Sequence, residues 1–96
     1  MKQKTLRIAV NAEYFDAMKS GEKVEEYRLV NPFWTTRLMG RDYDRLVITK
    51  GYPRKFDAER HITMPYRGYE VKTITHKHFG PDPVRVFAIK VQLEDA

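Results

Sequence analysis

The stretch SGEKVEEYRLV, residues 20 to 30, gathers opposed charges that could do chemistry. On an extended strand alternate side chains share a face, so Glu26 and Arg28 are neighbours on one face and Tyr27 lies on the other. Lys23 follows a glycine turn, where this alternation need not yet apply, and it can turn to either side. A lysine beside a carboxylate in a cleft can stabilise an oxyanion, or lose its proton when desolvated and act as a base. The plain alternative is a cross-strand ion pair with an exposed lysine.

A strand, a helix and a second strand are expected to position these side chains. Residues 6 to 10 alternate apolar and polar, as a half-buried strand does. Asn11 can cap a following helix, AEYFDAMKS, which stops at Gly21. A strand over about residues 24 to 30 then carries the charged stretch.

The rest of the chain predicts more strands than helices. Asn31 and Pro32 mark the start of a second short helix, on which Trp34 and Leu38 share one side and which ends at Gly40. Further strands are expected in the segments RLVITKG, HITM, YEVKTITH and VRVFAIKVQL. The last is apolar on both faces in its middle and should be a central strand. The short connections predict an α+β fold, a small mixed-topology β-barrel of about five or six strands with one or two short helices.

Length and composition narrow the classes of function. A chain of 96 residues predicts one domain over residues 1–96, and its net charge of +5 favours anionic partners such as phosphates or RNA. The absence of cysteine excludes disulfides, thiolate nucleophiles and cysteine zinc sites, and it suits a reducing cytoplasm. No apolar run approaches the roughly 20 residues that a membrane span needs, so neither a signal peptide nor a membrane helix is expected.

Gly21, Lys23, Glu26 and Arg28 fit the pattern GxKxxExR, the signature of the ASCH domain, a branch of the PUA-like superfamily of small β-barrels. The run EYRLVNPFWTTRL is similar to the EYR…W..RL run of short bacterial and phage-type ASCH proteins. The ITKGY and HFG segments and the closing apolar strand also resemble that group. The resemblance covers about residues 5 to 93 and implies a single ASCH domain with a PUA-like barrel.

The resemblance also implies a ligand and a reaction. ASCH proteins are thought to bind RNA or nucleotides in a cleft beside the motif; one group hydrolyses the amide of cytidine acylated on its exocyclic amine, and another is linked to RNA cleavage. In the amidohydrolase pattern the motif lysine is catalytic, a threonine stands three residues later, and a distant glutamate completes the site. Lys23 matches the lysine, but Glu26 occupies the place of the threonine, and no counterpart of the distant glutamate is evident. We therefore expect Glu26 to supply the carboxylate itself.

The expected function is hydrolysis of the amide of N4-acylated cytidine or a related modified nucleoside. Lys23 would activate a nucleophile or polarise the carbonyl, and Glu26 would shuttle a proton from water to the leaving amine. Arg28 would orient Glu26 or bind the substrate. A hydroxyl group at the site could come from one of three residues: Tyr27, Tyr52 or Thr49. The alternatives are an RNA-binding module, with single-stranded RNA as its partner, and a ribonuclease that uses the same basic cleft.

Two further residues are candidates for substrate binding. Trp34 can stack on a base, although a tryptophan at this spacing from Leu38 is more often a core residue. Arg37 can join a phosphate-binding rim, for which solvated ion pairs are the alternative. The other basic residues of this candidate rim are Arg41, Arg45, Lys50, Arg54, Lys55 and Arg60.

The three histidines are candidate metal ligands. His76 and His78 would point the same way if they alternate on a strand, and His61 could add a third imidazole. No carboxylate pattern accompanies them, so a surface location is expected. We predict no metal and no other cofactor.

Overall fold

The computed structural model describes residues 4–54 and 57–93. Its elements are, in order, β1 (Thr5–Val10), α1 (Ala12–Ser20), β2 (Glu25–Leu29), α2 (Pro32–Leu38), β3 (Arg45–Lys50), the 3-10 helix η1 (Ala58–Arg60), β4 (His61–Pro65), β5 (Tyr69–Ile74), the 3-10 helix η2 (Lys77–Phe79) and β6 (Val84–Lys90). Every strand and both α-helices expected from the sequence are present, which confirms the α+β fold class.

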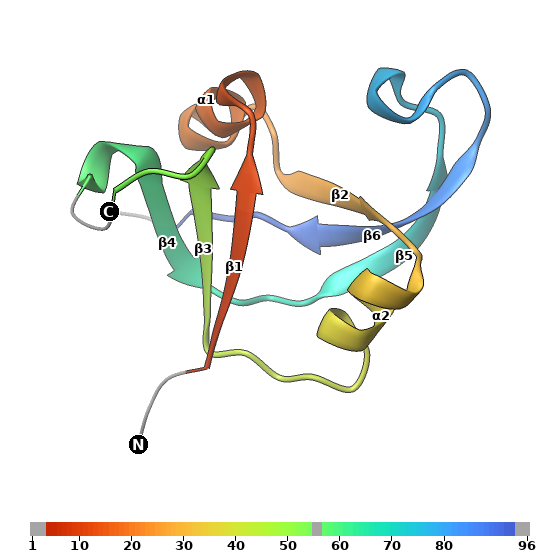
Figure 1. The fold of residues 1–96 in the computed structure, drawn as a ribbon, viewed down its shortest axis with the longest axis horizontal. Coiled ribbons are helices and arrows are strands. Elements are labelled where there is room, and N and C mark those ends of the chain that lie inside the picture. Colours follow the sequence, from red (N-terminus) through yellow and green to blue (C-terminus); the bar gives the residue numbers. More distant parts are fainter. Residues whose placement is uncertain (1–3, 55–56, 94–96) are drawn as a thin grey trace.

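The six strands form two three-stranded sheets, in the orders β1-β3-β4 and β2-β6-β5. β1 and β3 are parallel, and the other neighbours are antiparallel. The strands of the first sheet run nearly crosswise to those of the second (Figure 1). Within residues 4–54 and 57–93 no strand of one sheet pairs with a strand of the other, so the strand ladders do not close into the barrel that the sequence predicts.

The apolar core fills the space between the sheets. β1 alternates as expected and buries Leu6, Ile8 and Val10. Four successive residues of β6 are fully buried, from Val86 to Ile89, as befits a strand in the middle of its sheet. The prediction that the last strand is central is confirmed.

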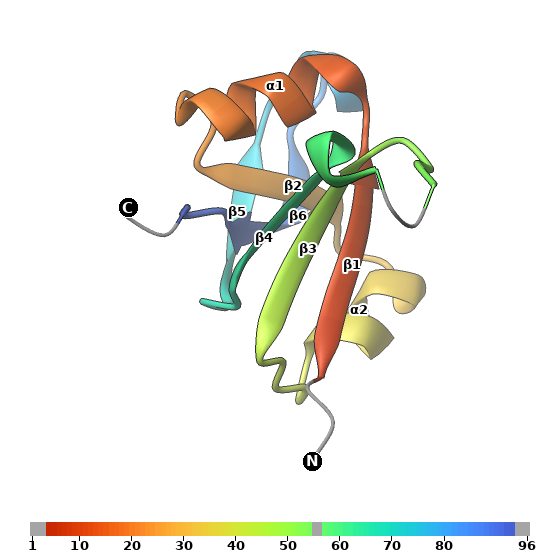
Figure 2. The ribbon, with the colours of Figure 1, turned by 90° about the vertical axis from the view of Figure 1, so that its left-hand side faces the viewer.

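Local chemistry fixes both helices. The Asn11 side chain accepts a hydrogen bond from the Tyr14 N–H at the start of α1, and Asn31 does the same for Trp34 at the start of α2. Gly21 ends α1 with φ of 88°, a left-handed conformation that glycine adopts at little cost. The two helices lie towards opposite ends of β1, as Figure 1 and Figure 2 show.

The segment after β5 differs from the prediction. β5 ends at Ile74, and His76 caps η2, in which His78 lies, so the two histidines do not alternate on a strand. The cause is local: the His76 Nδ1 accepts a hydrogen bond from the His78 N–H at 3.1 Å, and such a side-chain bond competes with a strand ladder.

The described residues include no helix with the length and apolar character that a bilayer crossing needs.

Candidate active site

A cavity of about 420 Å³ lies where an edge strand of one sheet, β1, meets an edge strand of the other, β2. Small-molecule sites in proteins commonly measure about 300–1,000 Å³, so the cavity has room for one modest ligand. It is walled by the end of β1, by much of β2, by Tyr14 and Trp34 from the two helices, and by residues of the η2 segment, namely His76, His78 and Phe79. We call this the seam cavity.

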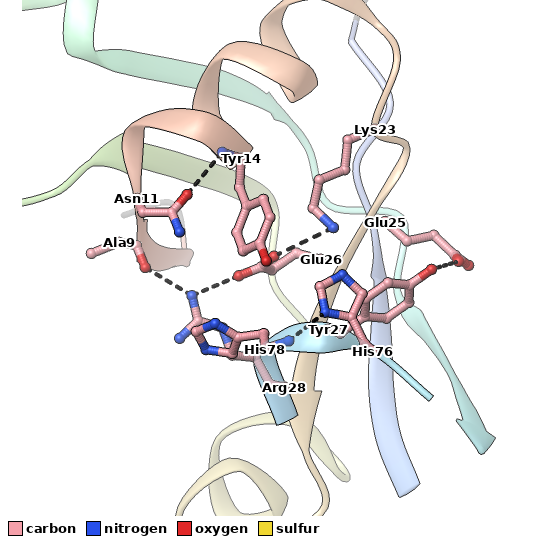
Figure 3. Close-up of polar contacts among 10 residues, drawn as sticks. All are labelled: Ala9, Asn11, Tyr14, Lys23, Glu25, Glu26, Tyr27, Arg28, His76 and His78. Carbon is pink, nitrogen blue, oxygen red and sulfur yellow. Dashed lines mark hydrogen bonds and ion pairs between the residues drawn. The ribbon is translucent and has the colours of Figure 1, made fainter. Parts of the chain in front are cut away.

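Glu26 is a buried carboxylate in the wall of the seam cavity. It is 5% exposed, and it lies on the inner face of β2 opposite Ile89. Its Oε2 accepts a hydrogen bond from the Arg28 Nη2 at 2.7 Å, and its Oε1 lies 3.9 Å from the Lys23 Nζ (Figure 3). A buried carboxylate without partners is costly, so these two cations are what allow it to be there.

Arg28 joins the two sheets. The same Nη2 that binds Glu26 donates to the carbonyl oxygen of Ala9 in β1 at 2.8 Å (Figure 3). The guanidinium group also lies 5.0 Å from the ring centroid of Trp34, a stacking arrangement that arginine favours. Arg28 therefore holds Glu26 in one orientation and spans the gap between β1 and β2.

Lys23 reaches the seam cavity from the turn after α1. Its backbone N–H donates to the carbonyl of Ala17 at 3.0 Å, and its ammonium lies 4.6 Å from the ring centroid of Tyr27 and 5.1 Å from that of Tyr14. Burial lowers the pKa of Lys23; the negative charges of Glu26 and Glu25 oppose this effect. Lys23 thus gives up its proton more readily than an exposed lysine.

Tyr27 lines the same cavity from the outer face of β2. Its hydroxyl donates to the Glu25 Oε1 at 3.0 Å, and the Glu25 Oε2 accepts a hydrogen bond from Lys72 at 2.7 Å. Burial, together with the bond to Glu25, raises the pKa of Tyr27. The phenol is therefore committed to Glu25 and is a poor nucleophile, whereas its ring forms part of the wall under Lys23.

Comparisons with protein-family models, with curated proteins and with solved structures gave no significant match.

The structure brings most of the predicted site residues together. Lys23, Glu26, Tyr27, Arg28 and Trp34 all line the seam cavity. The grouping extends over a turn, a strand and a helix. Trp34 also packs partly against the core, and its stacking on a base stays a prediction.

Three other candidates lie at or beyond the edge of the site. Tyr52 borders the seam cavity but is 97% exposed. Thr49 lines a second cavity on the outer face of the β1-β3-β4 sheet, and its hydroxyl donates to the carbonyl of Gly51 at 2.8 Å. Arg37 lies 4.0 Å from the ring centroid of Phe33 and does not line the seam cavity. Thr49 and Arg37 are thus not part of this site as the structure shows it.

The candidate phosphate rim is divided among separate contacts. Lys50 pairs with Asp16 at 3.1 Å, and Arg60 pairs with Asp57 at 3.1 Å. Lys55 lies outside the described residues. The solvated ion pairs that were the alternative interpretation are what the structure shows for Lys50 and Arg60.

Sequence reasoning missed the part of the aromatic wall that Tyr14 and the η2 segment supply. The ring centroid of His76 lies 5.9 Å from that of Tyr14 and 6.0 Å from that of Tyr27, and His78 contacts Phe79 at 5.1 Å between centroids. The run HKHF in a segment between strands was the available signal, because binding residues are disproportionately located on loops. Across the described ranges, no group of three or more His, Asp, Glu or Cys side chains is placed to hold a metal ion.

Proposed function

We propose that the protein hydrolyses the amide of cytidine acylated on its exocyclic amine, or of a related modified nucleoside, in the seam cavity. One observation carries the proposal: the buried Glu26 carboxylate contacts Arg28 at 2.7 Å and faces Lys23 at 3.9 Å within an aromatic-walled cavity. An ASCH domain with a PUA-like barrel belongs to the same proposal. Its support is the GxKxxExR spacing, placed on a turn and a strand after a helix, in a fold of two three-stranded sheets.

The distance between Lys23 and Glu26 suits a ligand between them. At 3.9 Å the Nζ and Oε1 atoms are further apart than in a hydrogen bond, which spans about 2.7–3.2 Å. A water molecule near both groups would accept a hydrogen bond from the Lys23 ammonium and donate one to the Glu26 carboxylate. These are the two partners that hydrolysis of an amide requires.

The proposed reaction uses water as the nucleophile. Glu26 takes a proton from the water as its oxygen bonds to the acyl carbon, and the carbonyl electron pair moves to oxygen to form an oxyanion. The Lys23 ammonium stabilises this oxyanion, an effect that is strong in a site of low dielectric constant. The oxyanion then re-forms the carbonyl, the carbon–nitrogen bond breaks, and Glu26 returns its proton to the leaving amine. The products are cytidine and a carboxylic acid.

The walls of the cavity suit a single nucleobase. Stacking of a base on an aromatic side chain contributes about 1–3 kcal/mol, and rings of Tyr14, Tyr27, Trp34 and His76 border the space. The ion pairs of Lys50 and Arg60 leave these cations poorly suited to form a continuous phosphate track. A nucleoside is therefore favoured over a long RNA strand.

The test is turnover of N4-acetylcytidine by the purified protein, followed by the change in absorbance as cytidine forms. We expect Lys23→Ala and Glu26→Gln each to reduce the rate by about 10²-fold or more, the usual contribution of an acid or base. Lys90→Ala and Glu70→Gln are matched controls, because both residues are exposed on neighbouring strands of the same sheet. Full activity in a folded Lys23→Ala or Glu26→Gln variant would refute the site.

The same preparation distinguishes the alternatives. If N4-acetylcytidine is stable in the presence of the protein, labelled single-stranded RNA is the next substrate. Salt-dependent RNA binding without cleavage would identify a binding module, and RNA cleavage would identify a ribonuclease.

A further inference from the structure

The seam cavity lies against the free edge of β2. Its wall includes four consecutive residues of this strand, from Glu26 to Leu29. Successive side chains of a strand point to opposite faces, so a cavity over one face would meet only every second residue. Contact with all four places the cavity beside the edge, where the main chain itself is exposed.

The ladder shows which backbone groups point into that edge. Val91 donates to the carbonyl of Val24, and Val30 donates to the carbonyl of Arg85, so both ends of the β2–β6 ladder are hydrogen-bonded pairs. Such pairs alternate with non-bonded pairs in an antiparallel ladder. The even-numbered residues of β2 therefore bond to β6, and the N–H and C=O groups of the odd-numbered residues point away from it.

Tyr27 and Leu29 are the odd-numbered residues that line the cavity. Among residues 4–54 and 57–93, no hydrogen bond joins the Tyr27 carbonyl or the Leu29 N–H to another element. On the facing edge of β1 the carbonyl oxygen of Ala9 already has a partner, because it accepts a hydrogen bond from Arg28. The open acceptor and donor on this side of the cavity thus belong to β2.

We propose that the Tyr27 carbonyl and the Leu29 N–H recognise the hydrogen-bonding edge of a nucleobase. Cytosine acylated on its exocyclic amine keeps one N–H, and this donor is adjacent to the ring nitrogen N3, an acceptor. The carbonyl of one residue and the N–H of the residue two positions later offer the complementary pair along the strand edge. The choice of cytosine rests on the proposed function; recognition by the strand edge rests on the geometry of β2.

Leu29→Pro tests the donor selectively. Proline removes the Leu29 N–H, which the ladder does not use, and edge strands tolerate proline where the N–H faces away from the sheet. Leu29→Ala is the matched control, since it removes the side chain and keeps the N–H. We expect Leu29→Pro to bind cytidine about tenfold more weakly than Leu29→Ala, the effect of one lost hydrogen bond.

Two further measurements keep the proposal testable if Leu29→Pro does not fold. In the wild-type protein, the amide resonance of Leu29 should shift downfield when cytidine is added. N4,N4-dimethylcytidine, which lacks the exocyclic N–H, should bind about tenfold more weakly than cytidine.

The outcomes separate recognition from catalysis. Equal cytidine affinity in Leu29→Pro and Leu29→Ala would overturn recognition by the edge while leaving N4-acetylcytidine turnover intact as evidence for the hydrolase. Cytidine binding with an unshifted Leu29 amide, or no cytidine binding at all, would also overturn it. Selective loss of binding in Leu29→Pro, in a protein that does not turn over N4-acetylcytidine, would support recognition by the edge and refute the proposed reaction.

Discussion

The contact between Glu26 and Arg28 should appear as a strong energetic coupling. Arg28→Met leaves a carboxylate that is 5% exposed with Lys23 at 3.9 Å as its remaining cation, and it also removes the bond to Ala9. Breaking a buried ion pair from one side costs about 3–5 kcal/mol, so we expect a loss of about 3 kcal/mol in the free energy of unfolding. Glu26→Gln should cost a similar amount, because it leaves the guanidinium beside a neutral amide.

The double variant Glu26→Gln/Arg28→Met should lose less than the two single variants together. The double variant carries neither charge, so no buried charge is left without its partner. We therefore expect a combined loss of about 4 rather than about 6 kcal/mol, a coupling of about 2 kcal/mol. Urea unfolding followed by circular dichroism measures all four free energies. The pair Glu25 and Lys72, on the other face of the sheet, is the control; its contact with water should make its coupling much smaller. Additive losses for Glu26 and Arg28 would refute this account of the site.

Two further predictions concern Lys23 and the core. Because burial lowers the pKa of Lys23, the unfolded chain binds its proton more tightly, and this residue should make the free energy of unfolding rise with pH up to about its ordinary pKa of 10.5. Lys23→Met should remove that contribution. Urea unfolding of the wild-type protein and of Lys23→Met between pH 7 and pH 10 measures the free energy of unfolding at each pH, and parallel pH dependence in the two proteins would contradict the prediction. Phe15→Ala should cost about 3–5 kcal/mol, since the ring is 1% exposed beneath α1, and a loss under about 1 kcal/mol in urea unfolding would be inconsistent with that packing.

The elements around the charged stretch could be predicted because their signals are local. Asn11 and Asn31 are followed directly by the helices they cap, and Gly21 stands where α1 needs a left-handed residue. The pairing of Glu26 with Arg28 follows from the alternation of a single strand. These features depend on residues that are close together in the sequence, so they can be predicted without knowing how distant segments pack.

The rest of the site depends on contacts between distant segments. Thr49 is on the predicted strand, yet its hydroxyl faces Gly51 and the second cavity. Tyr27 was expected to face away from Glu26; it reaches the same cavity because that cavity lies along the edge of β2 and not over one face. His76 lies at the seam cavity and not on the expected strand, because its side chain bonds to the His78 N–H and β5 ends before it. The two hydrogen bonds are local, but which of these residues borders the seam cavity depends on how the two sheets are placed, and no local pattern encodes that placement.

The seam cavity is assembled from segments that are remote in the chain, so it exists only when the protein is folded. Its walls come from both sheets, both helices and η2, so an unfolded chain offers no equivalent site. A ligand that binds the native state alone stabilises it by mass action, by about 2.7 kcal/mol at a concentration one hundred times its Kd. In a domain of this size such a gain raises the melting temperature by roughly 4–8 °C for each kcal/mol. A thermal-shift screen of nucleosides would therefore reveal an occupant of the cavity even when no chemistry follows binding.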